Sequence, residues 1–462
     1  MLSLLIFFAG LGAVTENEGA ALVFETDSFR YSLSAAARSV AFVDKATGAD
    51  YCNTSAETPF ARWIDDSARP ATAALLKDGL LALRFGGPER EARFRVKPEK
   101  RRLEFELVSL HGETDGLREL HFAAIPLTVA PDLKAPFAVS PLALNLEAHV
   151  AEIPGYSASL SGAKCFAQLG MEGAAMAVVA CPSGELREAL KDAIDGAKGI
   201  VKSLNGGPWA YDSTINQQSY FLDTSGKVNE DSVDGWIEML NGLGVRQLDL
   251  HAGHAFRFGD YVPNPSVYPQ GYQSLKNVVD KLHAAGIVAG LHTYAMFLAK
   301  DTPWVTPIPD PGLAKNAVFT LAASISETDA LVSVLESTEK MSALTGFHHR
   351  NSATLQIDDE LILFSGVSKE APYGFTDCTR GAYGTIVAPH VKDAKVYHLK
   401  ECFGLFAPDP DSELFYKVID ATAKTYNECG FDMLYLAPQN DFDARRGACN
   451  PLLSGDLIKC LT

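Results

Sequence analysis

The sequence predicts a multidomain protein of β and α/β structure. We expect an N-terminal β-sandwich, then a partial (β/α)8 barrel of the TIM type that is interrupted by an inserted β module. Three observations indicate this. Short strands with alternating apolar residues fill the first 200 residues, strand–helix units follow Gly207, and short β runs return over residues 316–400.

Length and composition set the limits for function. The chain has 462 residues, of which 47% are hydrophobic and 21% charged, so it is long enough for two or three domains. Its net charge of −17 argues against a nucleic-acid partner, because that binding depends on clustered Lys and Arg. No segment reaches the ~20 apolar residues of a membrane span, and we expect no membrane partner.

The first 15 residues resemble a signal peptide. An apolar run from Leu2 to Phe8 is followed by small residues from Ala9 to Ala13, which predicts a secreted or extracytoplasmic protein. The alternative is that the same residues form a buried N-terminal strand.

Residues 16–206 predict the β-sandwich. In "RRLEFELVSL" the apolar residues Leu103, Phe105 and Leu107 alternate with polar ones, as in a half-buried strand, and turn residues separate the neighbouring runs. Repeated short strands of this kind are typical of a sandwich. A helix is expected over residues 183–207, ending at two glycines that mark a domain boundary.

Residues 207–315 predict the first part of the barrel. Strands over 213–222, 245–253 and 287–297 alternate with helices over 229–244 and 272–286. This order indicates parallel βα units, and the apolar strands need both faces covered, as in a barrel or a doubly wound sheet. No phosphate-binding GxGxxG follows a strand, which argues against a dinucleotide fold.

The βα pattern stops for residues 316–400, the inserted β module, and returns over 401–436 with a helix at 411–430 and a strand from Phe431. Insertions are tolerated at loops because the barrel supplies the stability. Within the module, Asp358, Asp359 and Glu360 predict a solvated hairpin turn. The alternative of a calcium site lacks the spacing of an EF-hand.

The tail, residues 437–462, shows neither a helical nor a strand period. Four βα strands cannot close a barrel, and an open parallel sheet leaves an unpaired edge. We therefore predict that the tail is truncated or frame-shifted. The alternative is that a second chain supplies the other half.

Four segments carry a family resemblance: "FRYSLSAAARSVAFVDKATGADY", "GWIEMLNGLGVRQLDLHAG", "LHAAGIVAGLHTY" and "ECGFDMLYL". Over residues 20–300 and 401–437 they resemble the α-galactosidase (melibiase)-like retaining glycoside hydrolases, whose galactose-mutarotase-like sandwich precedes a (β/α)8 barrel. The resemblance implies an acidic residue near the sugar at the end of the second strand. It also implies a nucleophilic Asp after the fourth strand, where this chain has Ala437 and Pro438.

The candidate site lies where the strands end. Alternation places Asp249 and His251 on one face of their strand, opposite Leu248 and Leu250, at the rim where barrel enzymes bind substrate. The predicted catalytic residues are Asp249, His292 and Tyr294, and the predicted substrate-binding residues are His251, His254, Asp260 and Trp304. The alternatives are a structural Asp or helix cap, and aromatic residues that only pack loops.

The sequence thus predicts a glycoside hydrolase that acts on oligo- or polysaccharides with two carboxylates. A non-catalytic or degenerate sugar-binding protein is the first alternative, and a polysaccharide lyase using a His/Tyr pair is the second. We expect no cofactor and no metal, since His251 and His254 do not supply the three ligands of a catalytic zinc. Eight scattered cysteines leave disulfide pairing open, with Cys165 and Cys181 the nearest pair among the first five.

Overall fold

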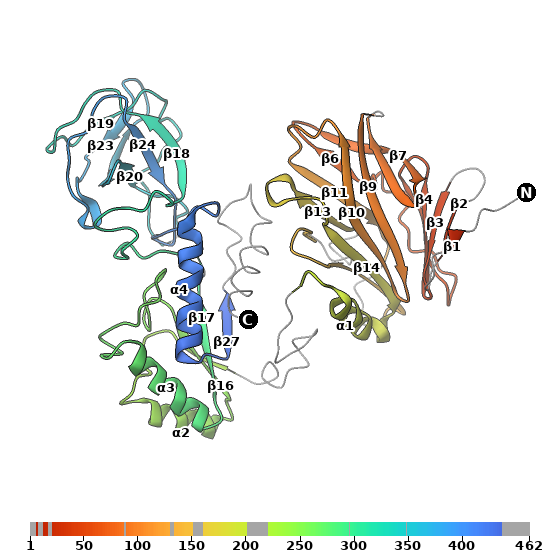
Figure 1. The fold of residues 1–462 in the computed structure, drawn as a ribbon, viewed down its shortest axis with the longest axis horizontal. Coiled ribbons are helices and arrows are strands. Elements are labelled where there is room, and N and C mark those ends of the chain that lie inside the picture. The colour runs from red at the N-terminus through yellow and green to blue at the C-terminus, as the bar shows by residue number, and fades with distance from the viewer. Residues whose placement is uncertain are drawn as a thin grey trace, which may run out of the picture. The chain divides into compact units, whose positions relative to one another are not determined.

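The computed structural model describes residues 6–7, 13–16, 21–86, 89–129, 134–150, 160–200, 220–294, 296–347 and 349–436. The predictions about the tail and about residues 201–219 lie outside the described residues. The chain divides into two compact units, Met1–Ser213 and Thr214–Thr462, called here the N-terminal and C-terminal units (Figure 1). The described structure is mainly β, with few helices.

Two antiparallel sheets make up the N-terminal unit. The five-stranded sheet follows chain order: β1 (Ile6–Phe7), β2 (Ala13–Glu16), β3 (Ala21–Glu25), β4 (Phe29–Ser34) and β5 (Ser39–Asp44). The nine-stranded sheet has the order β12-β14-β10-β9-β8-β7-β6-β11-β13. Its strands are β6 (Arg62–Ile64), β7 (Ala68–Lys77), β8 (Leu80–Phe85), β9 (Arg90–Glu99), β10 (Arg102–Gly112), β11 (Glu119–Pro126), β12 (Phe137–Ala143), β13 (Leu160–Phe166) and β14 (Ala175–Pro182).

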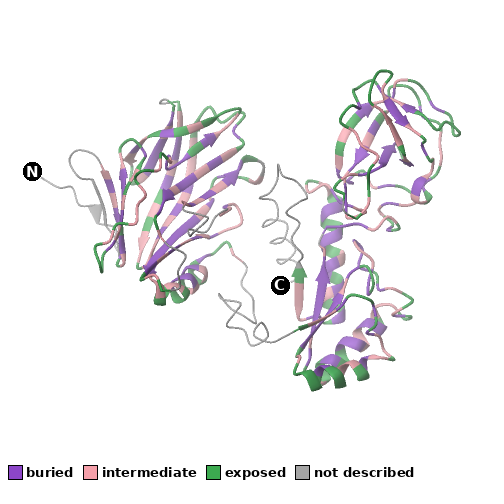
Figure 2. Cartoon of the chain, turned by 180° about the vertical axis from the view of Figure 1, so that it is seen from behind, coloured by how far each residue is buried: buried purple, intermediate pink, exposed green. Residues whose placement is uncertain are grey.

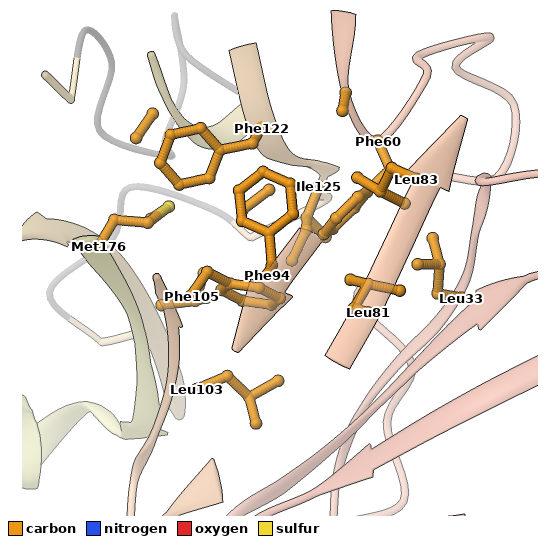
Figure 3. Close-up of a cluster of buried hydrophobic side chains, with 14 of the residues drawn as sticks. Leu33, Phe60, Leu81, Leu83, Phe94, Leu103, Phe105, Phe122, Ile125 and Met176 are labelled. Atoms are coloured by element: carbon orange, nitrogen blue, oxygen red, sulfur yellow. The ribbon is translucent and has the colours of Figure 1, made fainter. Parts of the chain in front are cut away.

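Both sheets contribute to one hydrophobic core. Leu33 from β4 packs in the same cluster as Leu81 from β8, Phe105 from β10 and Phe122 from β11 (Figure 3). The alternation predicted for "RRLEFELVSL" is confirmed, since Leu103, Phe105 and Leu107 have no exposed surface. Burial of large side chains from every second position is what holds the strands of each sheet in register.

The N-terminal residues that the structure describes are strands. β2 pairs with β3, and β1 pairs with β2, so both extend the five-stranded sheet. Strand pairing agrees with the alternative in which these residues form an N-terminal strand. The signal peptide stays a prediction.

The helix predicted over residues 183–207 is shorter than expected. A 3-10 turn at Ser183–Glu185 leads into α1 (Leu186–Gly196), which ends where Ala197 becomes extended. Gly199 then pairs with Asn145, and a side chain at Gly199 would overlap Asn145 Cβ. The prediction was wrong for residues 197–200, because this pairing outweighs the local helical pattern, and its last part, residues 201–207, lies outside the described residues.

A four-stranded parallel sheet forms the α/β part of the C-terminal unit. Its order is β15-β16-β17-β27, with α2 and α3 in the first two connections and α4 before the last strand. The bounds are β15 (Tyr220–Asp223), α2 (Val233–Leu243), β16 (Gln247–His251), α3 (Tyr272–Ala284), β17 (Val288–Thr293), α4 (Glu413–Cys429) and β27 (Met433–Leu436). The prediction of parallel βα units is confirmed for these residues.

One face of this sheet is apolar. Leu248 and Leu250 from β16 and Leu291 from β17 pack in one cluster with Val279 and Leu282 of α3. The central strands β16 and β17 are largely buried, whereas Tyr220 of β15 and Tyr435 of β27 are exposed. Helices α2 and α3 expose their outer surfaces (Figure 2). Covering this face with helices leaves the opposite face of the strands to carry the polar residues.

The region between β17 and α4 is again β structure. A sheet of order β18-β24-β20-β21 consists of β18 (Lys315–Thr320), β24 (Lys395–Leu399), β20 (Thr354–Ile357) and β21 (Glu360–Leu363). A second sheet holds β19 (Val332–Ser333), β23 (Gly374–Thr376) and β22 (Gly366–Ser368), and a small hairpin holds β25 (Glu401–Cys402) and β26 (Leu405–Phe406). Phe319, Leu355 and Phe375 belong to the core of this region.

The turn between β20 and β21 corrects one prediction. Asp358 has a positive φ of 50° and is exposed, as a turn residue should be. Glu360 is only 1% exposed, and its carboxylate is paired with the guanidinium of Arg380 at 2.7 Å. The solvated turn was therefore wrong for Glu360, whose partner lies 20 residues away.

Two further observations concern the described residues as a whole. No described helix combines the length and the apolar content that crossing a membrane requires. Cys165 and Cys181 are both buried and neither forms a disulfide in the described part of the chain.

Candidate functional site

The polar face of the parallel sheet brings together predicted residues of β16 and β17 with a tyrosine of β27 that was not predicted. In the register of the sheet, Asp249 of β16 lies beside Gly290 of β17. Two residues further along β16, His251 lies beside His292 of β17. His292 in turn lies beside Tyr435 of β27. Residues paired across neighbouring strands point to the same face, so these side chains share the surface opposite Leu248 and Leu250.

Asp249 is a fully buried carboxylate with one oxygen in use. Its Oδ1 accepts a hydrogen bond of 2.8 Å from Gln247 Nε2, on the same strand. Its Oδ2 is buried and has no hydrogen-bond partner among the described residues. Gly290 makes room for the group, since a Cβ at that position would overlap Asp249 Oδ1. A buried acceptor without a partner is costly, and such groups occur at functional sites.

Burial changes the acidity of Asp249. It raises the pKa of the carboxyl from 3.8 to about 6, and the Gln247 hydrogen bond only partly opposes the rise. The carboxyl is therefore protonated in a large share of molecules at mildly acidic pH. A carboxylic acid with a pKa in this range is suited to donating a proton in catalysis.

His292 lies in the middle of a stack of three rings. Its ring centroid is 4.7 Å from that of His251 and 4.4 Å from that of Tyr435, with interplanar angles of 20° and 10°. The ring is buried, and its Nδ1 has no hydrogen-bond partner among the described residues. Burial and the neighbouring His251 lower the pKa of His292 to about 4, so the ring is neutral at pH 7.

His251 has a defined tautomer. Its Nδ1 lies against the backbone oxygen of Ala252, and because a carbonyl only accepts, Nδ1 must carry the proton. In the neutral ring, Nε2 is then an acceptor. Burial lowers the pKa of His251 as well. The two histidines thus supply neutral imidazole groups, and neither adds a fixed charge to the site at pH 7.

Tyr294 lies between the polar face and Phe403, which is in the hairpin of β25 and β26. Its ring meets those of His251 and His292 edge-on, at 5.4 and 5.7 Å. On the other side it lies 6.5 Å from Phe403, which in turn lies 5.1 Å from Phe347. Phe347 is 65% exposed. A continuous aromatic series therefore leads from the buried histidines to the protein surface.

The other three predicted residues lie in different surroundings. His254 is exposed in the loop after β16. Asp260 is buried, but both its oxygens contact the guanidinium of Arg257, with Nε to Oδ1 at 3.0 Å. Trp304 is partly buried against an apolar cluster that includes Val305. The structure therefore brings together Asp249, His251, His292 and Tyr294. Of the other three, His254 interacts with this set electrostatically, since it contributes to the lowered pKa of His251.

Three residues of this face were not predicted: Gln247, Gly290 and Tyr435. Gln247 lies two positions before Asp249, and Gly290 two before His292, so strand alternation could have placed both on the polar face. Tyr435 could not have been found in this way, because its position beside His292 depends on which strands are neighbours.

The site offers no described metal centre. In the described ranges there is no group of three or more His, Cys, Asp or Glu side chains that could hold an ion. The described side chains of the face are one carboxyl group, two imidazoles and tyrosine rings.

Comparisons with known proteins give only distant likenesses. No family model and no curated protein sequence matches the chain. A quadruple mutant of the α-N-acetylgalactosaminidase of Bifidobacterium bifidum is 11% identical with a TM-score of 0.36, covering 60% of this chain and 59% of that one. The GH36 α-galactosidase of Geobacillus stearothermophilus is 8% identical with a TM-score of 0.46, covering 96% and 70%.

An α-galactosidase of Thermus thermophilus, in complex with stachyose, is 14% identical with a TM-score of 0.33, covering 100% of this chain and 72% of that one. This chain thus spans 59% of the first of these structures and somewhat more of the others. At such identities and TM-scores the likeness carries no information on activity or substrate.

Proposed function

We propose that this chain is a carbohydrate-active enzyme, a glycoside hydrolase that acts on oligo- or polysaccharides. In this proposal the parallel sheet is part of a (β/α)8 barrel, and its polar face binds the sugar at the bond that is cleaved. The observation that supports it most is the buried carboxyl of Asp249, with a pKa near 6 and one unpartnered oxygen.

Asp249 would act as the acid of the reaction. Because Oδ1 already accepts the Gln247 hydrogen bond, the proton of the neutral acid belongs on Oδ2. Oδ2 has no other described partner, and in this proposal the oxygen of the glycosidic bond takes that place when the substrate binds. Protonating that oxygen as the bond breaks is the role of the general acid in glycosidases.

The neighbouring rings would hold the sugar. His292 Nδ1 and His251 Nε2 can hydrogen-bond to sugar hydroxyls without placing a charge there, since both histidines have lowered pKa values. Tyr294 offers an aromatic surface and a hydroxyl at the outer end of the same face. This combination suits a neutral, hydroxyl-rich ligand.

The aromatic series supports a substrate of more than one sugar. Phe347 lies in a segment that Glu401 fixes at both ends, through Thr345 Oγ1 at 3.0 Å and Ser352 Oγ at 3.4 Å. Lys300 Nζ completes this anchor at 3.0 Å from Glu401 Oε2. An exposed ring that is held in place in this way can stack on a sugar beyond the cleaved bond.

A retaining mechanism needs a second carboxylate about 5–5.5 Å from the first. The family resemblance expects it after the fourth strand, beyond Leu436, and that segment lies outside the described residues. Within the described residues, the hydrogen bonding of Asp249 is limited to Gln247. The retaining mechanism is therefore proposed from the family resemblance.

The described residues place no second carboxylate in hydrogen-bond contact with Asp249. This favours the second candidate, a protein that binds sugars without cleaving them. Such a protein would need the polar face and the aromatic series but no second carboxylate. Carbohydrate would be the ligand in both cases. A location outside the cytoplasm, inferred from the first 15 residues, is also a proposal.

The test combines turnover and binding. The full chain is assayed on a panel of aryl α- and β-glycosides and oligosaccharides, and in parallel on a glycan array. We expect hydrolysis of at least one glycoside, lost in Asp249→Asn and kept in Asp44→Asn. Asp44 is a buried aspartate of the N-terminal unit that only holds a turn, through Ala46 N and Thr47 Oγ1.

Each other outcome has a meaning. Binding without turnover by the folded protein would favour the sugar-binding alternative. An unsaturated product that absorbs in the ultraviolet would instead identify a lyase, in which a His/Tyr pair removes a proton. A folded protein that neither binds nor cleaves any glycan would contradict the proposal.

A further inference from the structure

A row of basic side chains crosses one end of the nine-stranded sheet. In the strand register, His121 of β11 is paired with Arg62 of β6 on one side and with Lys164 of β13 on the other. The three strands are neighbours in Figure 1. His149 extends the row, since its backbone is bridged to that of Lys164 by two hydrogen bonds of 2.8 and 2.9 Å.

The backbone fixes this row in place. Cross-strand partners point to the same face of a sheet, so the four side chains lie side by side. The residues that follow Arg62 and Lys164 in their strands, Trp63 and Cys165, point the other way and are fully buried in the core. The basic groups are therefore presented by a rigid part of the N-terminal unit.

The four side chains line a pocket of about 250 Å³. Pro59 and Leu160 add apolar wall, and Thr58 adds a hydroxyl. Since a water molecule occupies about 30 Å³ in the liquid, the pocket has room for about eight waters. This is more space than a simple oxyanion needs.

The charges of Arg62 and Lys164 in the pocket have no carboxylate partner among the described residues. Neither Arg62 nor Lys164 forms an ion pair or a hydrogen bond through its side chain in the described part of the unit, although Lys164 Nζ lies 5.1 Å from the ring of Phe166. Burial and the charge of Lys164 lower the pKa of His149. His121 contacts Glu119 at 2.9 Å. The two fixed cations of the pocket, Arg62 and Lys164, contrast with a net charge of −17 for the whole chain.

We propose that this pocket binds a small organic anion, in which a carboxylate or a sulfate ester is carried on a body the size of a monosaccharide. Arg62 and Lys164 bind the anionic group, because guanidinium and ammonium groups form strong charge-assisted hydrogen bonds with such oxygens. Thr58 and the apolar wall contact the rest of the ligand. The pocket lies in the N-terminal unit, so this site does not depend on any chemistry at Asp249.

The test measures binding by titration calorimetry with the full chain at low salt. The probes are D-glucuronate, D-glucose 6-sulfate, inorganic sulfate and D-glucose. The variants are Arg62→Gln, Lys164→Gln and their combination, with Arg30→Gln as the matched control, since Arg30 is an exposed arginine of β4 that does not line the pocket.

At least one of the two sugar anions should bind, at least about tenfold more tightly than either glucose or inorganic sulfate. The double variant should weaken this binding by at least about tenfold, as expected for losing two charge-assisted contacts, and Arg30→Gln should not. Raising the salt concentration should weaken it as well. Equal affinity for glucose, equal affinity for inorganic sulfate, no anion binding, or unchanged binding in the double variant would each overturn the proposal.

Discussion

At the scale of single residues, Asp249 links stability to chemistry. Its pKa is 3.8 in an unfolded chain and about 6 in the folded protein, so between these values the folded state binds more protons. The stabilisation of the folded state by this bound proton is fully present below pH 3.8 and is lost as the pH rises through about 6. Above pH 6 the folded protein therefore carries a buried charge that costs up to about 3 kcal/mol.

Asp249→Asn should remove this cost. We expect the variant to raise the free energy of unfolding of the C-terminal unit by about 1–3 kcal/mol at pH 7.5, and to give no gain at pH 3.8. Denaturant unfolding or calorimetry at the two pH values measures the difference. A variant that is less stable than the parent at pH 7.5 would show that the carboxylate is not held at a cost.

Gly290 is the second residue whose identity the site requires. A methyl group there overlaps Asp249 Oδ1, so Gly290→Ala should lower the free energy of unfolding by about 1–3 kcal/mol. Gly235, exposed in α2 with nothing within 4 Å of an added Cβ, is the matched control, and Gly235→Ala should stabilise by about 0.5–1 kcal/mol. Combining Gly290→Ala with Asp249→Ala should recover part of the loss. Equal effects at the two glycines would contradict the close approach.

At the scale of elements, the hairpin of β20 and β21 depends on one buried carboxylate. Glu360 accepts hydrogen bonds from Arg380 at 2.8 and 2.7 Å, from His390 at 2.8 Å and from the backbone N–H of Gly381 at 2.9 Å. These bonds connect the hairpin to residues 380–390 and hold the pKa of Glu360 below its usual value.

Glu360→Gln should leave the Arg380 guanidinium buried without a carboxylate. Breaking one partner of a buried ion pair costs about 3–5 kcal/mol, so we expect a clear fall in the thermal stability of the C-terminal unit. Asp359→Asn, at the exposed neighbouring position, should change stability by less than about 0.5 kcal/mol. Calorimetry of both variants at pH 7 checks this, and similar melting of the two would refute the importance of the network.

Local patterns explain which elements could be predicted. The helices that became α2, α3 and α4 have apolar residues at helical spacing and a glycine at or near the end, such as Gly244 and Gly430, both of which adopt a positive φ. The error after Gly196 and the error at Glu360 share a cause. In both cases a residue distant in sequence, Asn145 or Arg380, decides the local structure.

At the scale of the whole chain, the site also combines features that follow from local sequence patterns with features that depend on residues distant in sequence. Alternation along β16 predicted that Asp249 and His251 share a face, and the spacing along β17 predicted His292 at the same height. The burial of Asp249, the space over Gly290 and the stacking of Tyr435 could not be predicted, since they follow from the order β16-β17-β27. The functional use of these residues stays a prediction.

The aromatic series that runs from Tyr294 through Phe403 to Phe347 allows a test of substrate length. If the series Tyr294, Phe403 and Phe347 binds a chain of sugars, Phe347→Ala should raise KM for an oligosaccharide substrate by about tenfold. It should leave KM for the corresponding aryl monosaccharide unchanged. Leu344→Ala, at an exposed apolar position of the same segment, is the control. An equal change for both substrates would contradict an outer sugar site.

The central claim is that Asp249 donates the proton that breaks a glycosidic bond. The most direct test is kcat/KM against pH, from 4 to 8, for the best substrate of the panel, in the parent chain and in Asp249→Asn. We expect the parent activity to fall as the pH rises through about 6, where the carboxyl loses its proton. The variant should lose about 10²–10⁴-fold in kcat/KM and lose this limb of the profile. A variant that keeps the parent's rate and its alkaline limb would contradict the claim.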